Sequence, residues 1–169
     1  EGARVEAGTV TIIAAAPKDL LEECRPILEI QGQITYTGER PGMGQAVKHC
    51  NQLLVATTLA ATSEVITLAR KSGLDPQVVC QVVGSGICGS DYFRLVASSI
   101  LNQTPSPGGL GQMCKDIGLV INDSKRVQVP LVVASAANQY FLSALSLGME
   151  NADSSELIKI LEKMTIPDE

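Results

Sequence analysis

The sequence predicts a mainly helical protein that begins with a short β-α-β unit. No Gly or Pro interrupts the chain between Gly44 and Gly73, so residues 42–71 are expected to form one helix of about eight turns. Two short β-branched runs, residues 8–15 and 33–37, precede this helix and predict strands. Small or apolar residues cover nearly the whole circumference of the long helix, so we expect it to be central and buried on several sides.

Composition limits the classes of protein to which the chain can belong. Hydrophobic residues make up 45% of it and charged residues 18%, which excludes a disordered tail. No uninterrupted apolar run reaches the roughly 20 residues of a membrane span, so no membrane partner is expected. The formal net charge is -5, and no basic stripe with interleaved aromatic residues occurs, which argues against nucleic acid.

The cysteines favour a reduced, cytoplasmic protein. They are five in number, are scattered, and form no C-x-x-C pair, so neither a zinc site nor a disulfide framework is indicated. Cys50 and Cys114 fall inside helical patterns and are expected to be small core residues, because the only histidine is His49. The chain begins at Glu1 without a positively charged leader, so we expect no signal peptide and a missing N-terminal portion.

The first 41 residues predict a strand, a helix and a second strand. The helix is expected to start at Pro17, to be weakened by Pro26 and to end at Gly32. Two strands and one helix cannot form a stable sheet alone, so residues 1–41 are interpreted as the trailing edge of a larger sheet. Residues 42–169 are interpreted as a separate helical domain.

Local signals divide the rest of the chain into helices. Asp75 followed by Pro76 predicts a helix start, and Ser90 or Asp91 predicts another. The spacing of Asp153 and Glu156 is that of a capping box. The helices expected after residue 73 begin near residues 76, 91, 110, 131 and 154, and the last carries Leu157, Ile160, Leu161 and Met164 on its apolar face.

The start of the long helix carries the densest polar chemistry. Lys48 is followed at i+3 and i+4 by Asn51 and Gln52, so an ammonium and two amides share one face. Such a face can bind a small polyhydroxy acid, because lysine attracts a carboxylate or moves a proton and amides hold hydroxyl groups. The alternative is a lysine that only extends from an amphipathic helix. Gly44 permits close approach of a ligand or of another segment.

Three segments together resemble the β-hydroxyacid dehydrogenase family, which includes 3-hydroxyisobutyrate and L-threonate dehydrogenases. They are EAGTVTI from residue 6, GMGQAVKHCNQ from residue 42, and KDIGLVINDSKRVQVPL from residue 115. The resemblance covers essentially the whole chain, and the sequence looks most like the L-threonate branch of the family. It implies a β-α-β remnant of a dinucleotide-binding domain, followed by a helical C-terminal substrate and dimerisation domain like that of 6-phosphogluconate dehydrogenase.

The resemblance also implies roles for individual residues. Lys48 would be the catalytic lysine, with Asn51, Gln52 and Gly44 as substrate-binding residues, while Lys115 and Asp116 would lie at the cofactor. Gln52 departs from the asparagine of the family motif and reaches one methylene further, which suggests a different or larger hydroxy acid. For Asp116 the alternative is that it only orients Lys115 or caps a neighbouring backbone group.

The implied reaction is hydride transfer between a small hydroxy acid, threonate or similar, and NAD or NADP. No G-x-G-x-x-G follows a strand in this sequence, so we expect the cofactor to bind in a complete protein that includes an upstream dinucleotide-binding domain. The isolated chain is expected to be inactive and to form a homo-oligomer. Two alternatives remain: a non-catalytic helical association module derived from the family, and an unrelated helical bundle.

Overall fold

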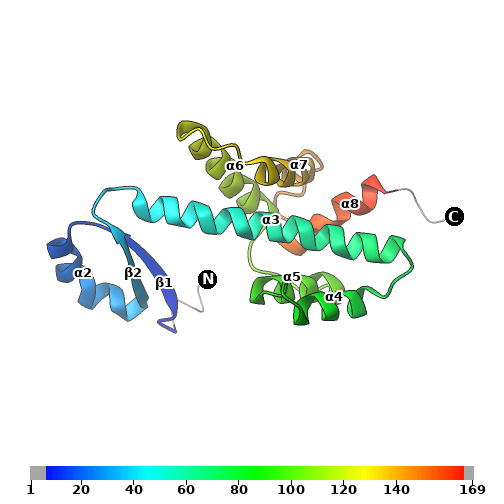
Figure 1. Ribbon diagram of the computed structural model, residues 1–169, viewed down its shortest axis with the longest axis horizontal. Coiled ribbons are helices and arrows are strands. Elements are labelled where there is room, and N and C mark those ends of the chain that lie inside the picture. The colour runs from blue at the N-terminus through cyan, green and yellow to red at the C-terminus, as the bar shows by residue number, and fades with distance from the viewer. Residues whose placement is uncertain (1–6, 166–169) are drawn as a thin grey trace. The chain divides into compact units, whose positions relative to one another are not determined.

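The computed structural model describes residues 7–165 and is mostly helical with one small parallel sheet, as predicted (Figure 1). Two compact units make up the chain, Glu1–Asn51 and Gln52–Glu169. The division falls inside the long helix α3 (Met43–Lys71), whereas the domain boundary predicted from the sequence lies between residues 41 and 42. The first turns of α3 thus belong with the sheet, and the assignment of two functional domains stays a prediction.

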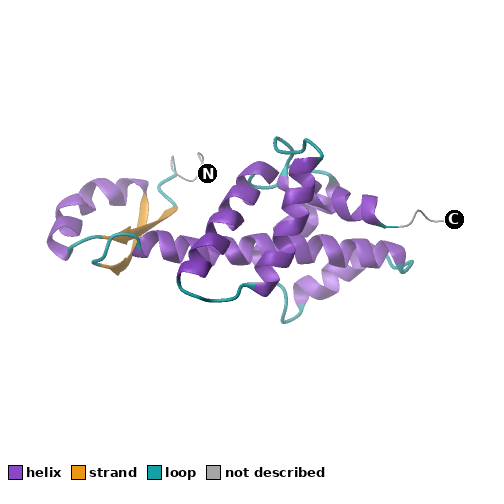
Figure 2. Cartoon of the chain, turned by 90° about the horizontal axis from the view of Figure 1, so that it is seen from above, coloured by secondary structure: helices purple, strands orange, loops and turns teal. Residues whose placement is uncertain are grey.

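The first unit is the predicted β-α-β unit. Strand β1 (Val10–Ala15) leads into α2 (Lys18–Gln31), and the chain returns in β2 (Gly32–Gly38); the two strands are orange in Figure 2. Strand β2 pairs parallel to β1, with Val10 opposite Gly32. A Cβ atom at Gly32 would lie only 1.8 Å from the carbonyl oxygen of Val10. Only glycine allows the strands to pair at this point, because any side chain would push them apart.

Helix α2 is continuous through Pro26 and exposes much of its apolar surface. Leu21 is buried, whereas Ile27 is 68% exposed and Ile30 is 75% exposed. A helix that covers a sheet normally buries such residues against further strands. The exposed apolar face of α2 is therefore surface that a two-stranded sheet does not cover.

The second unit contains the rest of α3 and the helices that follow it. In chain order these are α4 (Pro76–Ser85), α5 (Asp91–Asn102), α6 (Leu110–Arg126), α7 (Val132–Ser146), the short 3-10 helix η1 (Ser154–Leu157) and α8 (Ile158–Met164). Contacts are densest between α6 and α7, and α4 lies beside α5 (Figure 1). Every predicted helix is present within a few residues of its expected bounds.

The core of the second unit joins one face of α3 to the surrounding helices. Leu59 and Ile66 of α3 are buried in one apolar cluster with Ile117 of α6 and Phe141 of α7. Ala56 also belongs to this cluster, and its small side chain lets the neighbouring helices approach closely. The core is thus built mainly from aliphatic side chains and alanines.

Burial of α3 is incomplete. Leu54 and Leu68 are exposed, so burial does not extend around the whole circumference of the helix, although apolar residues do. The helix is long and apolar enough to cross a membrane by length and composition, a test that the core helix of a soluble protein also passes. Three of its hydroxyl groups are buried and donate to backbone carbonyls one turn earlier, namely those of Thr62, Ser63 and Thr67.

The predicted helix caps are confirmed. The side chains of Asp75 and Ser90 accept hydrogen bonds from backbone N–H groups in the first turns of α4 and α5. Asp153 and Glu156 form both hydrogen bonds of a capping box at η1. Met164, which we expected on the apolar face of the last helix, is exposed instead.

Candidate active site

Two glycines allow the first unit to start α3 close to its sheet. Gly42 has a φ of +92°, a left-handed conformation that glycine adopts without strain. A Cβ atom at Gly44 would lie 2.7 Å from the carbonyl oxygen of Ile13 in β1. Of the two possibilities raised for Gly44, the structure shows the close approach of another segment. A substrate contact by Gly44 stays a prediction.

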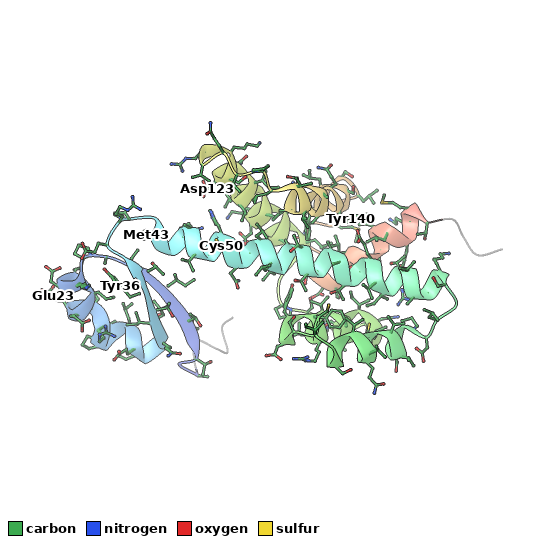
Figure 3. All side chains as sticks on the ribbon, in the orientation of Figure 1. Glu23, Tyr36, Met43, Cys50, Asp123 and Tyr140 are labelled. Atoms are coloured by element: carbon green, nitrogen blue, oxygen red, sulfur yellow. The ribbon has the colours of Figure 1, made fainter. Side chains whose placement is uncertain are left out.

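The polar face predicted at the start of α3 is accessible. Lys48 and Asn51 are both exposed and lie one turn apart on the helix. Beside them, the Nε2 atoms of Gln45 and His49 are 2.8 Å apart, which joins two further side chains on successive turns. Cys50 is exposed rather than buried, so the prediction that it fills the core is wrong (Figure 3).

In the second unit, Gln52 and Asp116 meet although they are far apart in sequence. The Nε2 atom of Gln52 donates to Oδ2 of Asp116 at 2.6 Å, and Nε2 of Gln112 donates to Oδ1 of the same carboxylate at 2.8 Å. One carboxylate therefore holds two amides, one from α3 and one from α6. Gln112 was not among the residues predicted from the sequence, although its i, i+4 spacing to Asp116 was a usable signal.

The contacts of Asp116 fit neither part of the alternative given for it, which was that it orients Lys115 or caps a backbone group. Within the described residues, its hydrogen bonds go to the two amides and not to Lys115 or to a backbone group. Lys115 itself is exposed on α6. Asp116 is therefore placed to act on the predicted substrate-binding amide rather than on its lysine neighbour.

Cys114 lies on the buried side of α6. Its side chain is buried in the apolar cluster, as predicted, and burial raises the pKa of its thiol. A buried thiol with a raised pKa is a poor nucleophile. The polar chemistry of α6 near this point is thus carried by Gln112, Lys115 and Asp116.

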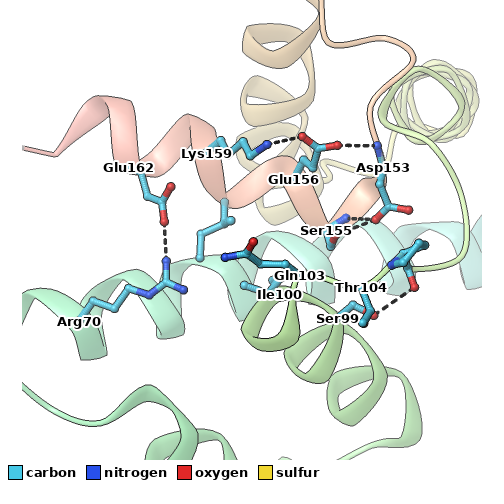
Figure 4. Close-up of a pocket in the computed structure, with 12 residues that line it drawn as sticks. Arg70, Ser99, Ile100, Gln103, Thr104, Asp153, Ser155, Glu156, Lys159 and Glu162 are labelled. Atoms are coloured by element: carbon cyan, nitrogen blue, oxygen red, sulfur yellow. Dashed lines mark hydrogen bonds and ion pairs between the residues drawn. The ribbon is translucent and has the colours of Figure 1, made fainter.

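A pocket in the second unit lies away from Gln112, Lys115 and Asp116. It has a volume of about 440 Å³ and is lined by residues of α3, α5, η1 and α8 and of the loop after α5 (Figure 4). Arg70, on its wall, is 18 residues beyond Gln52, which corresponds to roughly 27 Å along α3. Among the residues that the structure describes, its cations are paired, Arg70 with Glu162 and Lys159 with Glu156, so this lining offers no free positive charge to an anion.

Comparison with known proteins identifies the family. Residues 42–161 match the family described as "NAD-binding of NADP-dependent 3-hydroxyisobutyrate dehydrogenase". The match begins at the glycine that opens α3 and ends in α8. NAD binding is thus attributed in this family to the helical region that contains Lys48, Asn51, Gln52, Lys115 and Asp116.

Individual relatives agree with this match. The chain is 31% identical to 2-(hydroxymethyl)glutarate dehydrogenase of Eubacterium barkeri and 32% identical to L-threonate dehydrogenase of Escherichia coli K12, covering 95% of this chain and 54% of each relative. The crystal structure of 3-hydroxyisobutyrate dehydrogenase from Salmonella typhimurium superposes with a TM-score of 0.85 at 28% identity, covering 95% of this chain and 57% of that chain. The chain therefore spans about half the length of the relatives that it matches, and it belongs to the 3-hydroxyisobutyrate dehydrogenase family.

Proposed function

We propose that this chain is part of an NAD(P)-dependent 3-hydroxyacid dehydrogenase and supplies its catalytic lysine and substrate-binding amides. The observation that carries the proposal is the exposed Lys48, one turn before Asn51, on a helix that opens with two glycines and lies within the matched family region. The names of the relatives support a small hydroxy acid as substrate, with threonate or a similar acid as the first candidate.

The residues suit the two halves of alcohol oxidation. Lys48 takes the proton of the substrate hydroxyl group, and the alcohol carbon loses a hydride as it becomes a carbonyl carbon. Bound NAD or NADP supplies the acceptor for that hydride at C4 of the nicotinamide. Asn51 and Gln52 hold the other oxygens of the acid, and Lys115 provides an exposed positive charge for the cofactor side of the site.

The complete protein needs more sheet than this chain contains. The exposed apolar face of α2 and the two-stranded sheet support an upstream dinucleotide-binding domain that continues β1 and β2. Residues 1–41 would be the trailing edge of that domain. Residues 42–169 would be the helical substrate and dimerisation domain, of the 6-phosphogluconate dehydrogenase C-terminal type, in a cytoplasmic enzyme.

The proposal is tested by joining this chain to the half of a relative that it does not span. In the joined protein, this chain is fused to the half of E. coli L-threonate dehydrogenase that it does not span. We expect the joined protein to oxidise L-threonate with NAD or NADP, and the 169-residue chain alone to show no turnover. Pyrophosphate binding at a Gly-rich turn supplies much dinucleotide affinity, so calorimetry on the chain alone should show no binding near micromolar to tens of micromolar concentrations.

Two results would contradict the proposal, one from the activity of the joined protein and one from dinucleotide binding by the chain alone. A folded joined protein that oxidises neither threonate nor 3-hydroxyisobutyrate would contradict the enzymatic role. Tight NAD or NADP binding by the chain alone would show that the matched helical region holds the dinucleotide without an upstream domain.

An association role is the second candidate, and exposed apolar residues favour it. At the start of α7, Val132 is 75% exposed and Val133 is 70% exposed, which is costly unless another surface covers them. We expect the chain to form a homodimer or larger homo-oligomer by light scattering. Replacing both valines with glutamate should reduce its mass to that of the monomer, whereas Leu74→Glu, at another exposed apolar site, should not. A monomer mass for the unaltered chain at all concentrations would eliminate this role.

A further inference from the structure

The pocket lined by the end of α5, η1 and α8 has a floor of buried side chains. Its volume of about 440 Å³ falls within the range of roughly 300–1,000 Å³ that small-molecule sites occupy in proteins. Ile100 of α5 and Ile158 of α8 belong to the lining and are each 6% exposed. Ser99 and Ser155, which are also buried, add hydroxyl groups to the same lining. A ligand that fits this floor therefore carries an aliphatic portion.

The described lining of this pocket carries more negative than positive charge. It holds the carboxylates of Asp153, Glu156 and Glu162 and the cations of Arg70 and Lys159. Both cations are used inside the lining, because Arg70 pairs with Glu162 and Lys159 pairs with Glu156. The charge that remains in excess is the negative charge of Asp153.

No cation pairs with Asp153 among the residues that the structure describes. Its carboxylate accepts from the backbone N–H of Ser106 and from the N–H and hydroxyl of Ser155, and all of these donors are neutral. An aspartate is ionised at neutral pH. These hydrogen bonds therefore fix the position of the carboxylate and leave its net charge uncompensated.

The end of α5 adds partial negative charge to the same lining. The backbone N–H groups of Gln103 and Thr104 both donate to the carbonyl oxygen of Ser99, so neither satisfies the carbonyl groups of residues 100–102. Carbonyl oxygens at the end of a helix form the negative end of its dipole and favour a cation. Gln103 belongs to the lining at this end, and in Figure 4 its amide lies between Arg70 and Ser155.

We propose that this pocket binds a small aliphatic amine, whose ammonium group faces Asp153 and the end of α5 and whose alkyl group covers Ile100 and Ile158. The ammonium group compensates the excess negative charge of the lining. An alcohol of the same shape gains only the apolar contact. The carboxylate of an amino acid would meet cations that are already paired and three carboxylates in the same lining, so an amino acid binds less tightly than the amine.

Binding is measured in the 169-residue chain, so the result does not depend on the proposed function. The methyl signals of Ile100 and Ile158 are assigned in carbon-13 NMR spectra by their loss in Ile100→Val and Ile158→Val. We expect 3-methylbutylamine to shift both sets of signals, with a Kd of about 1–10 mM. 3-Methylbutanol has the same alkyl group without charge, and L-leucine is the same amine with an added carboxylate. Both should bind at least about tenfold more weakly at equal ionic strength.

Charge at position 103 tests where the ammonium group lies. Gln103→Lys places a cation in the pocket and should weaken amine binding about tenfold, whereas Gln103→Glu should strengthen it roughly threefold. Gln128 provides the matched control, because it is also exposed and its φ of +57° resembles the +54° of Gln103. Gln128→Lys and Gln128→Glu should leave the affinity unchanged.

Several results would overturn the proposal. One is the absence of any shift in the signals of Ile100 and Ile158 when the amine is added to a chain with a normal circular-dichroism spectrum. Another is binding of the alcohol or of leucine as tight as that of the amine, which would show that the pocket does not select an ammonium group. The same conclusion would follow if both Gln103 variants folded normally and bound the amine like the unaltered chain.

Discussion

Lys48→Ala in the joined protein is expected to lower turnover by roughly a hundredfold or more, with cofactor affinity nearly unchanged. General acid–base catalysis by a positioned side chain contributes about this factor, and alanine cannot move the hydroxyl proton. The exposed position of Lys48 one turn before Asn51 suits contact with substrate. Steady-state kinetics with L-threonate would measure turnover, and calorimetry with NAD or NADP would measure cofactor binding.

Two further variants distinguish proton transfer by Lys48 from an effect of its positive charge. Lys48→Arg keeps the positive charge but introduces a group that does not release its proton, so turnover should remain low. Lys71→Ala removes the same charge and atoms from the opposite end of α3 and should leave turnover near normal. Near-normal turnover in Lys48→Ala would show that this lysine is structural, and activity restored by arginine would assign it to charge alone.

Asp153→Asn is expected to lower the free energy of unfolding by about 2–3 kcal/mol, because it breaks a network that ties the loop after α5 to η1. The backbone N–H of Ser106 donates to both oxygens of Asp153 at 3.0 Å, and the N–H and hydroxyl of Ser155 donate to Oδ1 at 2.9 and 2.6 Å. An asparagine would turn an NH2 group toward at least one of these donors. A fall in Tm of roughly 5–10 °C should follow.

The stability contributed by Asp153 should depend on pH. Burial raises the pKa of this carboxyl, but the hydrogen bonds from Ser155 and Ser106 outweigh burial and hold the pKa below its ordinary value of 3.8. A lowered folded-state pKa contributes stability that is fully present above the unfolded value and is lost as pH falls through the folded value.

Urea unfolding at two pH values would measure this dependence. The difference in stability between the unaltered chain and Asp153→Asn should be full at pH about 7 and should shrink as the pH falls below 3.8. Asp91→Asn, at a fully exposed carboxylate that pairs with Arg94 on its own helix, should change stability little at either pH. A difference for Asp153→Asn that stays constant from neutral to strongly acidic pH would contradict this account of Asp153.

Helix starts were predictable because their signals are local. Asp75, Ser90 and the pair Asp153 and Glu156 each act on backbone groups two or three residues away, so spacing in the sequence is enough to recognise them. The β-α-β unit was predictable for a similar reason, since its strands and helix follow one another with short connections. The face that carries Lys48 and Asn51 also follows directly from helical spacing.

Exposure along the same helix could not be predicted in this way. Cys50, Leu54 and Leu68 look like core residues by type and position, yet they are exposed, because burial depends on which neighbours pack against each face. The prediction for Met164 was wrong for the same reason, since this residue lies in the last turn of the short helix α8 and is exposed. Residue type alone does not say which apolar positions a small unit can cover.

The sequence by itself determined the helical fold class, the parallel β-α-β order and the glycine-opened helix that presents Lys48 and Asn51, because periodicity and caps act over a few residues. Only the tertiary structure decided that Asp116 contacts Gln52 and Gln112 rather than Lys115. Gln52 and Asp116 lie 64 residues apart, and packing of α3 on α6 brings them within hydrogen-bond distance. A contact between distant residues depends on how whole helices pack, which no local pattern encodes.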